Sequence, residues 1–391
     1  MLDFTTIWIY FLILGILVGF SILLVRNFPF YRKIIKEEER GRFESLDGLR
    51  GFLAINVFFQ HAVTSHFYFQ SGVWEIVPIR FYRHLGGEAV ILFFILTSFL
   101  YWSKAIAQKG DIDAGALYRS RFLRLAPMYL FTAGIIIFSI FIQSGLDIDI
   151  RETVKGILSF LSLGLITTTS VNNISVLPIN AGIHWTLAFE WVFYLMLPIL
   201  AVSLKGKKMF IMALPLAFFA PSSPLRGYWA IFLFGIMAAH IYKKYPEIKF
   251  FQKSISSLVP ILGVVLIYFI SYKPYSFTQY FISLGVFLSF VYGADLFGLL
   301  KTEVAKFLGT ISYSVYLIHS IMLFAILNSI DYFYPITSIS PTVFWSLILF
   351  SGVITISVSS LTYRYVEYPF IKRIKTRKVE NLKTKIIDQI M

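Results

Sequence analysis

Long apolar stretches alternate with short charged segments along most of the 391-residue chain. Many stretches reach the roughly 20 residues that a helix needs to cross about 30 Å of hydrocarbon. Because a helix satisfies its own backbone hydrogen bonds inside a bilayer, this pattern predicts an all-α, polytopic transmembrane helix bundle. The predicted spans, about eleven with an N-terminal anchor before a ten-span core, lie near residues 6–25, 50–67, 86–103, 126–143, 183–203, 208–221, 226–242, 255–272, 278–298, 306–328 and 342–362.

The basic residues between the spans predict their orientation. No basic residue precedes the first span and no small-residue cleavage site ends it, so we interpret it as a retained anchor and not as a signal peptide. Lys and Arg mark the cytoplasmic side of a membrane protein. This predicts an outside N-terminus, a cytoplasmic C-terminus, and cytoplasmic positions for RNFPFYRKIIKEEERGR, for the basic loops at 104–124, 205–208, 243–253 and 301–306, and for the tail after Arg364.

One apolar stretch, residues 156–170, disturbs this orientation if it crosses the membrane, because the three lysine loops that follow would then face outward. We interpret it as re-entrant or interfacial. The uncharged VNNISVLPINAG that follows suits the lining of a polar cavity, where irregular backbone is tolerated at membrane depth. No internal repeat of fixed period is present, which weakens an inverted-repeat transporter as an interpretation.

Composition narrows the chemistry. Hydrophobic residues make up 57% of the chain and charged residues 14%, as a membrane protein requires. The net charge of +14 lies mostly in the loops, so it indicates topology and we expect no nucleic-acid partner. The chain has no cysteine, which excludes disulfides, thiolate metal sites and an acyl-cysteine mechanism.

The segment LDGLRGFLAINVFFQHAV carries two polar residues that are costly in a membrane. Arg50 and His61 are eleven positions apart. That is almost three helical turns, so they share one face about 16 Å apart along the axis. Arg50 alone could be a snorkelling anchor, and His61 could simply cross-link helices by hydrogen bonding. A mid-span histidine is nevertheless a functional hypothesis by default, because imidazole exchanges protons near neutral pH.

Other polar residues fall within the predicted spans. Glu190 is too deep for a lipid-facing charge and needs a partner, for which His61, an arginine or a sugar hydroxyl are candidates. Alternatively, a protonated Glu190 would only lock two helices together by a hydrogen bond. Ser312, Tyr316 and His319 have the i, i+4, i+7 spacing of one helical stripe, which could line a passage or hydrogen-bond between helices.

The remaining candidates receive structural interpretations. Asp47 precedes Arg50 at the helix start, where it would cap the helix or form a salt bridge. His184 lies near the outer end of its span, as an interfacial residue or an acceptor contact. We assign no role to three histidines near span ends, where ordinary solvation accounts for them: His66, His84 and His240. No His-x-x-x-His pair is present, so no metal site is predicted.

Six segments occur in one order and together resemble acyltransferase family 3, the integral membrane acyltransferases. LDGLRGFLAINVFFQH resembles the Arg-x10-His signature of that family. The other five are GGEAVILFFILTSFLYW, RSRFLRLAPMYL, HWTLAFEWVFYLMLPIL, LGTISYSVYLIHSIML and RYVEYPF. The resemblance covers about residues 43–370 and divides the chain into an anchor and linker at 1–42, a membrane acyltransferase domain at 43–370, and a basic tail at 371–391. Thr97-Ser98 stands where the family usually has Ser-Gly, which puts close backbone approach at that turn in doubt.

The resemblance implies transfer of an acyl group, usually acetyl, from cytoplasmic acyl-coenzyme A to a sugar hydroxyl. Acceptors of the family often belong to surface polysaccharide, lipopolysaccharide or peptidoglycan, which implies a bacterial cytoplasmic membrane. Acetyl-CoA is thus the expected co-substrate, and a glycan or glycolipid the expected acceptor. If transfer takes two steps, an extracytoplasmic partner protein would complete it.

Residue roles follow for this reaction. His61 is the candidate general base, or the nucleophile of a covalent variant. Arg50, with Arg119, Arg121 and Arg124, would hold the phosphates of coenzyme A, although such residues at a helix end also serve as topology signals. Arg50 and Glu190 complete the catalytic group with His61. Substrate-lining positions are assigned to Ser312, Tyr316, His319 and Trp185.

A transporter or flippase is the competing hypothesis. In it, His61 and Glu190 would form a proton relay or a binding site for a polar or lipid-linked solute. Arg50 discriminates between the two, because only an enzyme with a phosphorylated donor requires an arginine three turns below the histidine.

Overall fold

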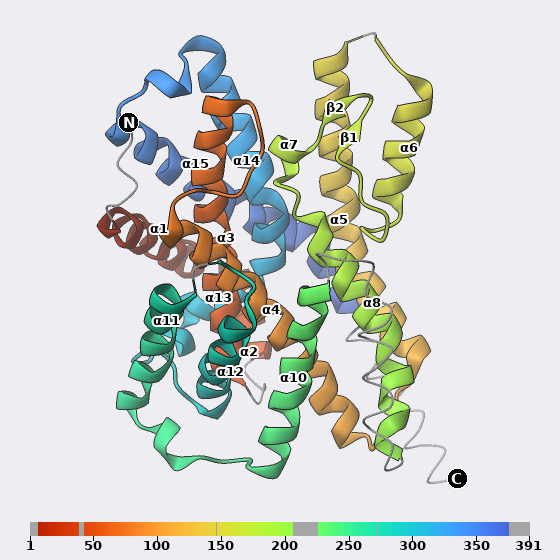
Figure 1. Cartoon of the computed structure of the whole chain (residues 1–391), viewed down its shortest axis with the longest axis vertical. Helices are drawn as coiled ribbons and strands as arrows, with labels where there is room; N and C mark the ends of the chain where they lie inside the picture. Colours follow the sequence, from red (N-terminus) through yellow and green to blue (C-terminus); the bar gives the residue numbers. More distant parts are fainter. Residues whose placement is uncertain (1–6, 39–42, 146, 206–225, 272, 375–391) are drawn as a thin grey trace.

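The computed structural model describes residues 7–38, 43–145, 147–205, 226–271 and 273–374. These residues form an almost wholly helical protein (Figure 1). The first half contains α1 (Trp8–Asn27), α2 (Pro29–Glu38), α3 (Glu44–Ser71), α4 (Arg80–Ala107), α5 (Ala114–Ser144), α6 (Ile150–Leu161), the short strands β1 (Ser170–Val171) and β2 (Ile174–Ser175), α7 (Leu177–Asn180), α8 (His184–Ala201) and the 3-10 turn η1 (Val202–Lys205).

The second half begins after the undescribed residues 206–225, which contain the predicted span 208–221. It contains α10 (Arg226–Lys244), the 3-10 turns η2 (Lys249–Gln252) and η3 (Ser254–Ser257), α11 (Leu258–Ile270), α12 (Phe277–Tyr292), η4 (Leu299–Lys301), α13 (Glu303–Thr310), α14 (Ser312–Phe333), η5 (Ile336–Ser338), α15 (Pro341–Thr362) and the π-helical turn η6 (Tyr363–Glu367).

Six helical segments of the described chain are long and apolar enough to cross a membrane, which agrees with the predicted all-α membrane protein. They are α1, α4, α5, α8 with η1, α14, and α15 extended to Ile374. The apolar helices Ser254–Ile270 and Phe277–Tyr292 are shorter. The predicted number of spans therefore stays a prediction.

Two predicted spans are wrong in their bounds. The span predicted at 306–328 is broken at Ile311 into α13 and α14. The span predicted at 278–298 ends at Tyr292, because Gly293 takes a φ of 124°, a backbone conformation that ends the helix and that glycine adopts most easily. Periodicity alone shows neither break, since apolar residues continue beyond each of them.

The stretch at 156–170 has too little helix to cross the membrane. Only α6 is helical there, and its 12 residues reach about 18 Å. After α6 the chain forms the antiparallel hairpin of β1 and β2. In Figure 1 the two strands lie beside the upper part of α5. This agrees with the re-entrant or interfacial interpretation.

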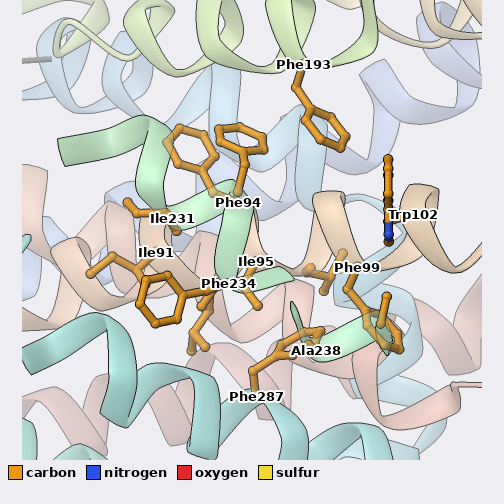
Figure 2. Packing of buried hydrophobic residues seen from close by; sticks show 14 of the residues in the cluster. Ile91, Phe94, Ile95, Phe99, Trp102, Phe193, Ile231, Phe234, Ala238 and Phe287 are labelled. Atoms are coloured by element: carbon orange, nitrogen blue, oxygen red, sulfur yellow. The ribbon is translucent and has the colours of Figure 1, made fainter. Parts of the chain in front are cut away.

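Helix α4 lies in the main hydrophobic core and is packed by α8, α10 and α12 (Figure 2). Phe94 stacks on Phe232 with ring centroids 4.7 Å apart, and Phe193 stacks on Phe232 at 4.9 Å. A Cβ atom at Gly235 of α10 would lie 1.9 Å from the Ser98 hydroxyl oxygen and 2.3 Å from the Ile95 carbonyl oxygen. Close approach at this turn, which the Thr97-Ser98 sequence put in doubt, is therefore present, and the glycine that permits it is on the facing helix.

The start of α3 lies against α13 and η4 just as closely. A Cβ at Gly309 would meet the Asp47 carbonyl oxygen at 1.8 Å, and one at Gly48 would meet the Leu300 carbonyl oxygen at 2.1 Å. A Cβ at Gly51 would lie 2.5 Å from Cβ of Leu308. Small residues on both sides thus hold the first turns of α3, and with them Arg50, against the neighbouring helices.

Candidate active site

Two adjoining cavities lie beside the start of α3. The larger, here called the basic cavity, measures about 490 Å³ and is lined by charged residues that include Glu44, Asp47 and Lys306. The smaller, here called the inner cavity, measures about 210 Å³ and is lined mostly by aromatic and aliphatic side chains of α4, α5, α8 and α14. Both cavities share three lining residues: Arg50, Arg121 and Arg124. The arginines therefore stand where a charged compartment meets an apolar one.

The three arginines have different surroundings. Arg124 lies 3.0 Å from a carboxylate oxygen of the fully buried Glu367. That oxygen has no aligned donor among the described residues, so the contact is a charge contact without hydrogen-bond geometry. Arg121 lies over the rings of Tyr101 and Tyr194, at 5.0 and 5.8 Å from their centroids.

Arg50 has neither a salt bridge nor an aromatic ring beneath it among the described residues, although it acts electrostatically on Glu190 and Glu367. It forms no hydrogen bond or ion pair with any residue that the structure describes, and it is only partly exposed. A guanidinium in that position can bind an incoming anion without first breaking an internal pair.

Glu190 lies in the wall of the inner cavity. One oxygen accepts a hydrogen bond from the Thr97 hydroxyl at 3.0 Å, and the other accepts a longer one from the Tyr194 hydroxyl at 3.4 Å. Of the partners considered from sequence, His61 is not hydrogen-bonded to Glu190 in the described chain, whereas Arg121 and Arg50 interact with Glu190 electrostatically and without a hydrogen bond. The hydroxyl of Thr97 supplies the partner.

The polar stripe of α14 divides between two places. Ser312 and Tyr316 line the inner cavity, where the Tyr316 hydroxyl lies 2.9 Å from that of Thr186 and the Ser312 hydroxyl donates to the Gly309 carbonyl at 2.7 Å. His319 does not belong to that lining. Trp185 does not belong to it either and packs against Tyr228, with ring centroids 4.7 Å apart. His319 and Trp185 thus do not line the inner cavity with Ser312 and Tyr316, and the alternative interpretation of the stripe, hydrogen bonding between helices, holds for His319 and Tyr316.

His319 instead pairs with His61. Nδ1 of His61 lies 2.8 Å from Nε2 of His319, and Nδ1 of His319 lies 3.1 Å from the carbonyl oxygen of Val315. His319 is fully buried, whereas His61 keeps part of its surface accessible. His61 also lies outside the described lining of the inner cavity, three turns beyond Arg50 on α3.

Comparison with known proteins identifies the family. The family model described as an acyltransferase domain, that of acyltransferase family 3, matches residues 43–364. The protein belongs to this family. A curated relative, acyltransferase MdmB of Streptomyces mycarofaciens, is 37% identical over 103 residues, a match that spans 25% of each chain. No solved structure matches the chain. Since six helices of the described ranges are long and apolar enough to cross a membrane, the protein is a membrane acyltransferase.

Several positions of this acyltransferase differ from the sequence-based assignments. Arg119 is exposed and lines neither cavity, so the structure does not bring it to Arg50. His66 and His84 are buried, at 2% and 5% exposure, and His240 accepts a hydrogen bond from the Trp102 indole at 3.0 Å. Ordinary solvation therefore does not account for these histidines.

His184, expected at the membrane interface or against the acceptor, is buried between the rings of Tyr129 and Phe160. Its ring centroid lies 4.9 Å from that of Tyr129 and 5.1 Å from that of Phe160. His184 is thus a packing residue of α8.

Glu367 is the residue that sequence analysis missed. It ends the π-helical turn η6, which interrupts the α-helix that continues from α15, and such turns occur frequently at functional sites. Its other oxygen accepts a short hydrogen bond from Ser314, so it joins α5, α14 and η6 behind Arg124. The signal was the glutamate of RYVEYPF, a carboxylate in an apolar setting that needs a cation.

Proposed function

We propose that this membrane acyltransferase moves an acyl group, acetyl in the first instance, from cytoplasmic acyl-coenzyme A to a hydroxyl of a glycan or glycolipid. His61 is the general base of that transfer. The observation that supports the proposal is the arrangement along α3. There Arg50, which forms no hydrogen bond or salt bridge with the described residues, faces two cavities, and the partly accessible His61 follows three turns later.

The donor end is supported by the basic cavity. Coenzyme A carries phosphates, and guanidinium groups bind phosphate by charge-assisted, often bidentate hydrogen bonds. Arg50 and Arg121 meet that need best, because Arg124 already faces Glu367. The inner cavity beyond them has the aliphatic and aromatic lining that suits the thioester arm of the donor. With the predicted orientation, the basic cavity opens to the cytoplasm.

The transfer at His61 needs no reactant besides acyl-coenzyme A and the acceptor hydroxyl. Nε2 takes the proton from the acceptor hydroxyl while the oxygen attacks the thioester carbonyl carbon. The carbon–sulfur bond then breaks, and the same proton passes from Nε2 to the sulfur of the departing coenzyme A. General-base catalysis of this kind contributes about 10² to 10⁴ in rate. In the covalent variant, Nε2 itself attacks the carbonyl, the carbon–sulfur bond breaks and coenzyme A leaves as the thiolate. The hydroxyl oxygen then attacks the acyl-imidazole, the carbon–nitrogen bond breaks, and the hydroxyl proton ends on the sulfur of coenzyme A.

The transporter hypothesis has less support. A proton relay from His61 to Glu190 needs a continuous chain of hydrogen bonds between them. In the described chain the hydrogen bonds of the Glu190 carboxylate go to Thr97 and Tyr194, and the imidazole of His61 bonds to His319. The two side chains thus belong to separate hydrogen-bonded groups.

The absence of cysteine permits a direct test. A thiol reagent will report only coenzyme A released from acetyl-CoA, since the chain has no thiol of its own. Purified protein in lipid nanodiscs is supplied with acetyl-CoA and an envelope glycan fraction. We expect release of coenzyme A with transfer of labelled acetyl to the glycan, and a loss of about 10² to 10⁴ in rate in His61→Ala.

A matched control is His66→Leu, five residues further along the same helix, which should keep most of the activity. Full activity in folded His61→Ala would refute the assignment of the base. Glycan or glycolipid movement across the bilayer without acyl-CoA would favour the transporter instead.

A further inference from the structure

The hydrogen-bonding pattern of the two histidines defines their protonation on each ring nitrogen. A carbonyl oxygen can only accept a hydrogen bond. Nδ1 of His319, 3.1 Å from the Val315 carbonyl oxygen, must therefore carry its proton. In a neutral imidazole the other nitrogen is then an acceptor, so Nε2 of His319 offers a lone pair to His61.

The same reasoning continues to His61. Its Nδ1 lies 2.8 Å from that lone pair and must donate, which places the proton of a neutral His61 on Nδ1. Nε2 of His61 is left with a free lone pair. The Val315 carbonyl thus sets the donor and the acceptor in both hydrogen bonds, because the bond at one ring nitrogen of a histidine determines the protonation of the other nitrogen.

The ring geometry supports a well-directed bond. The two ring planes differ by only 4°, and their centroids are 5.1 Å apart. With the nitrogens 2.8 Å apart, this separation fits two coplanar rings that meet edge to edge, since stacked rings would not bring the nitrogens into line between their centres. The N–H bond and the lone pair both lie in the ring planes, so the arrangement is favourable for a hydrogen bond.

His61 keeps part of its surface accessible, and Nε2 is its ring nitrogen without a hydrogen bond in the described chain. Nε2 of His61 has no hydrogen-bond partner among the described residues, yet it is not one of the buried polar atoms that lack partners. His319, in contrast, is fully buried with both ring nitrogens occupied. One ring of the pair can therefore reach a substrate, and the other cannot.

We infer that His319 is a positioning residue that holds His61 in the tautomer whose free Nε2 accepts the proton of the acceptor hydroxyl. This inference rests on the proposed function, in which His61 is the base. It replaces the substrate-lining role expected for His319. When His61 is protonated, its Nδ1–H bond to His319 becomes charge-assisted, which stabilises the imidazolium formed during transfer.

Two substitutions separate positioning from mere packing. His319→Leu keeps an apolar side chain of moderate size and removes both hydrogen bonds. His319→Gln keeps an amide that can accept from His61 and donate to the Val315 carbonyl. We expect His319→Leu to lower kcat by roughly 10² or more, because a base in the wrong tautomer costs about 10⁴ in a Ser-His-Asp enzyme. His319→Gln should recover about tenfold, as one restored hydrogen bond would. The KM for acetyl-CoA should stay unchanged in both.

A second measurement does not depend on turnover. Nuclear magnetic resonance of isotope-labelled ring nitrogens distinguishes the two neutral tautomers, and the chain has only six histidines, so the signals of His61 can be assigned by difference from His61→Ala. We expect a proton on Nδ1 of His61 in the wild-type protein and a mixture of tautomers in His319→Leu.

The outcomes are distinguishable. Wild-type kcat in His319→Leu, with His61→Ala inactive, would overturn the positioning role and leave the proposed function intact. A proton on Nε2 of wild-type His61 would overturn it as well, even if His319→Leu failed to fold. Full activity in His61→Ala would overturn the proposed function itself, and the role of both histidines with it.

Discussion

The two functional ends of α3 differ in almost every physical property. Around Arg50 lie the inner cavity, the basic cavity and two further arginines, and the basic cavity is lined by both acidic and basic side chains. Around His61 the partner is another imidazole, fully buried and held by a backbone carbonyl. The first environment suits binding of a charged ligand, because Arg50 and Arg121 form no salt bridge with the described residues and line both cavities. The second suits proton transfer, because the buried His319 fixes the His61 imidazole by a hydrogen bond.

This difference indicates that the helix separates substrate binding from chemistry along its length. The separation is about 16 Å, which an extended donor arm can bridge. Substitutions at one end should therefore leave the property measured at the other end unchanged, and four variants test this from the largest expected effect to the smallest.

The largest effect should come from the pair of Arg124 and Glu367. Arg124→Leu leaves the buried carboxylate without its cation, and breaking such a pair costs about 3 to 5 kcal/mol. We expect a lower thermal midpoint in detergent, followed by the fluorescence of the seven tryptophans. The double variant Arg124→Leu with Glu367→Gln should recover most of the loss. A single variant as stable as the wild type would show that the pair has no structural role.

The next effect should come from Arg50→Ala, compared with Arg119→Ala. A lost hydrogen bond to a charged group costs about 1.5 to 3 kcal/mol, or roughly 10- to 150-fold in binding. We expect the KM for acetyl-CoA to rise by that factor in Arg50→Ala, with the His61 tautomer unchanged. Arg119→Ala, at an exposed position outside both cavities, should keep the wild-type KM. Equal effects of the two substitutions would show that the arginines act only through their general charge.

The contrast between these two arginines also shows how far the sequence could lead. Spacing along one helix predicted that Arg50 and His61 share a face, and the hydrophobic stretches predicted an all-helical membrane protein. Spacing could not distinguish Arg119 from Arg121, because the rotation of α5 against α4 and α8 depends on packing between helices. It could not pair His61 with His319 either, since 258 residues separate them in the sequence.

The same limit applies to the stripe of α14. Residues at i, i+4 and i+7 share a face of an isolated helix, but two neighbours divide that face here. Thr186 of α8 meets Tyr316, and α3 meets His319 one turn later. The hydroxyl of Thr97 as partner of Glu190 was likewise beyond reach, because it comes from a different helix.

A smaller effect should come from Gly51→Ala, directly after Arg50. The new Cβ would lie 2.5 Å from Cβ of Leu308 and 2.6 Å from its carbonyl carbon, so α3 and α13 must separate at the basic cavity. Overpacking of this kind costs about 1 to 3 kcal/mol. We expect a lower thermal midpoint and a higher KM for acetyl-CoA, with an unchanged His61 tautomer. Gly285→Ala on α12 meets nothing within 4 Å and is the matched control. A disturbed tautomer in Gly51→Ala would contradict the separation of the two ends.

The smallest effect should come from the cap of α6, which lies in neither region. The backbone N–H of Glu152 donates to the Asp149 carboxylate at 3.1 Å, and this hydrogen bond lowers the pKa of Asp149 below its usual value. A lowered pKa means that the cap stabilises α6 at neutral pH and that this stabilisation is lost as the pH falls through the lowered value. Asp149→Ala should therefore speed hydrogen exchange of the first amides of α6 at neutral pH, and the difference from the wild type should shrink in acid. Because α6 contributes no lining residue to either described cavity, the KM for acetyl-CoA should not change, and a changed KM would mean that α6 is coupled to the donor end.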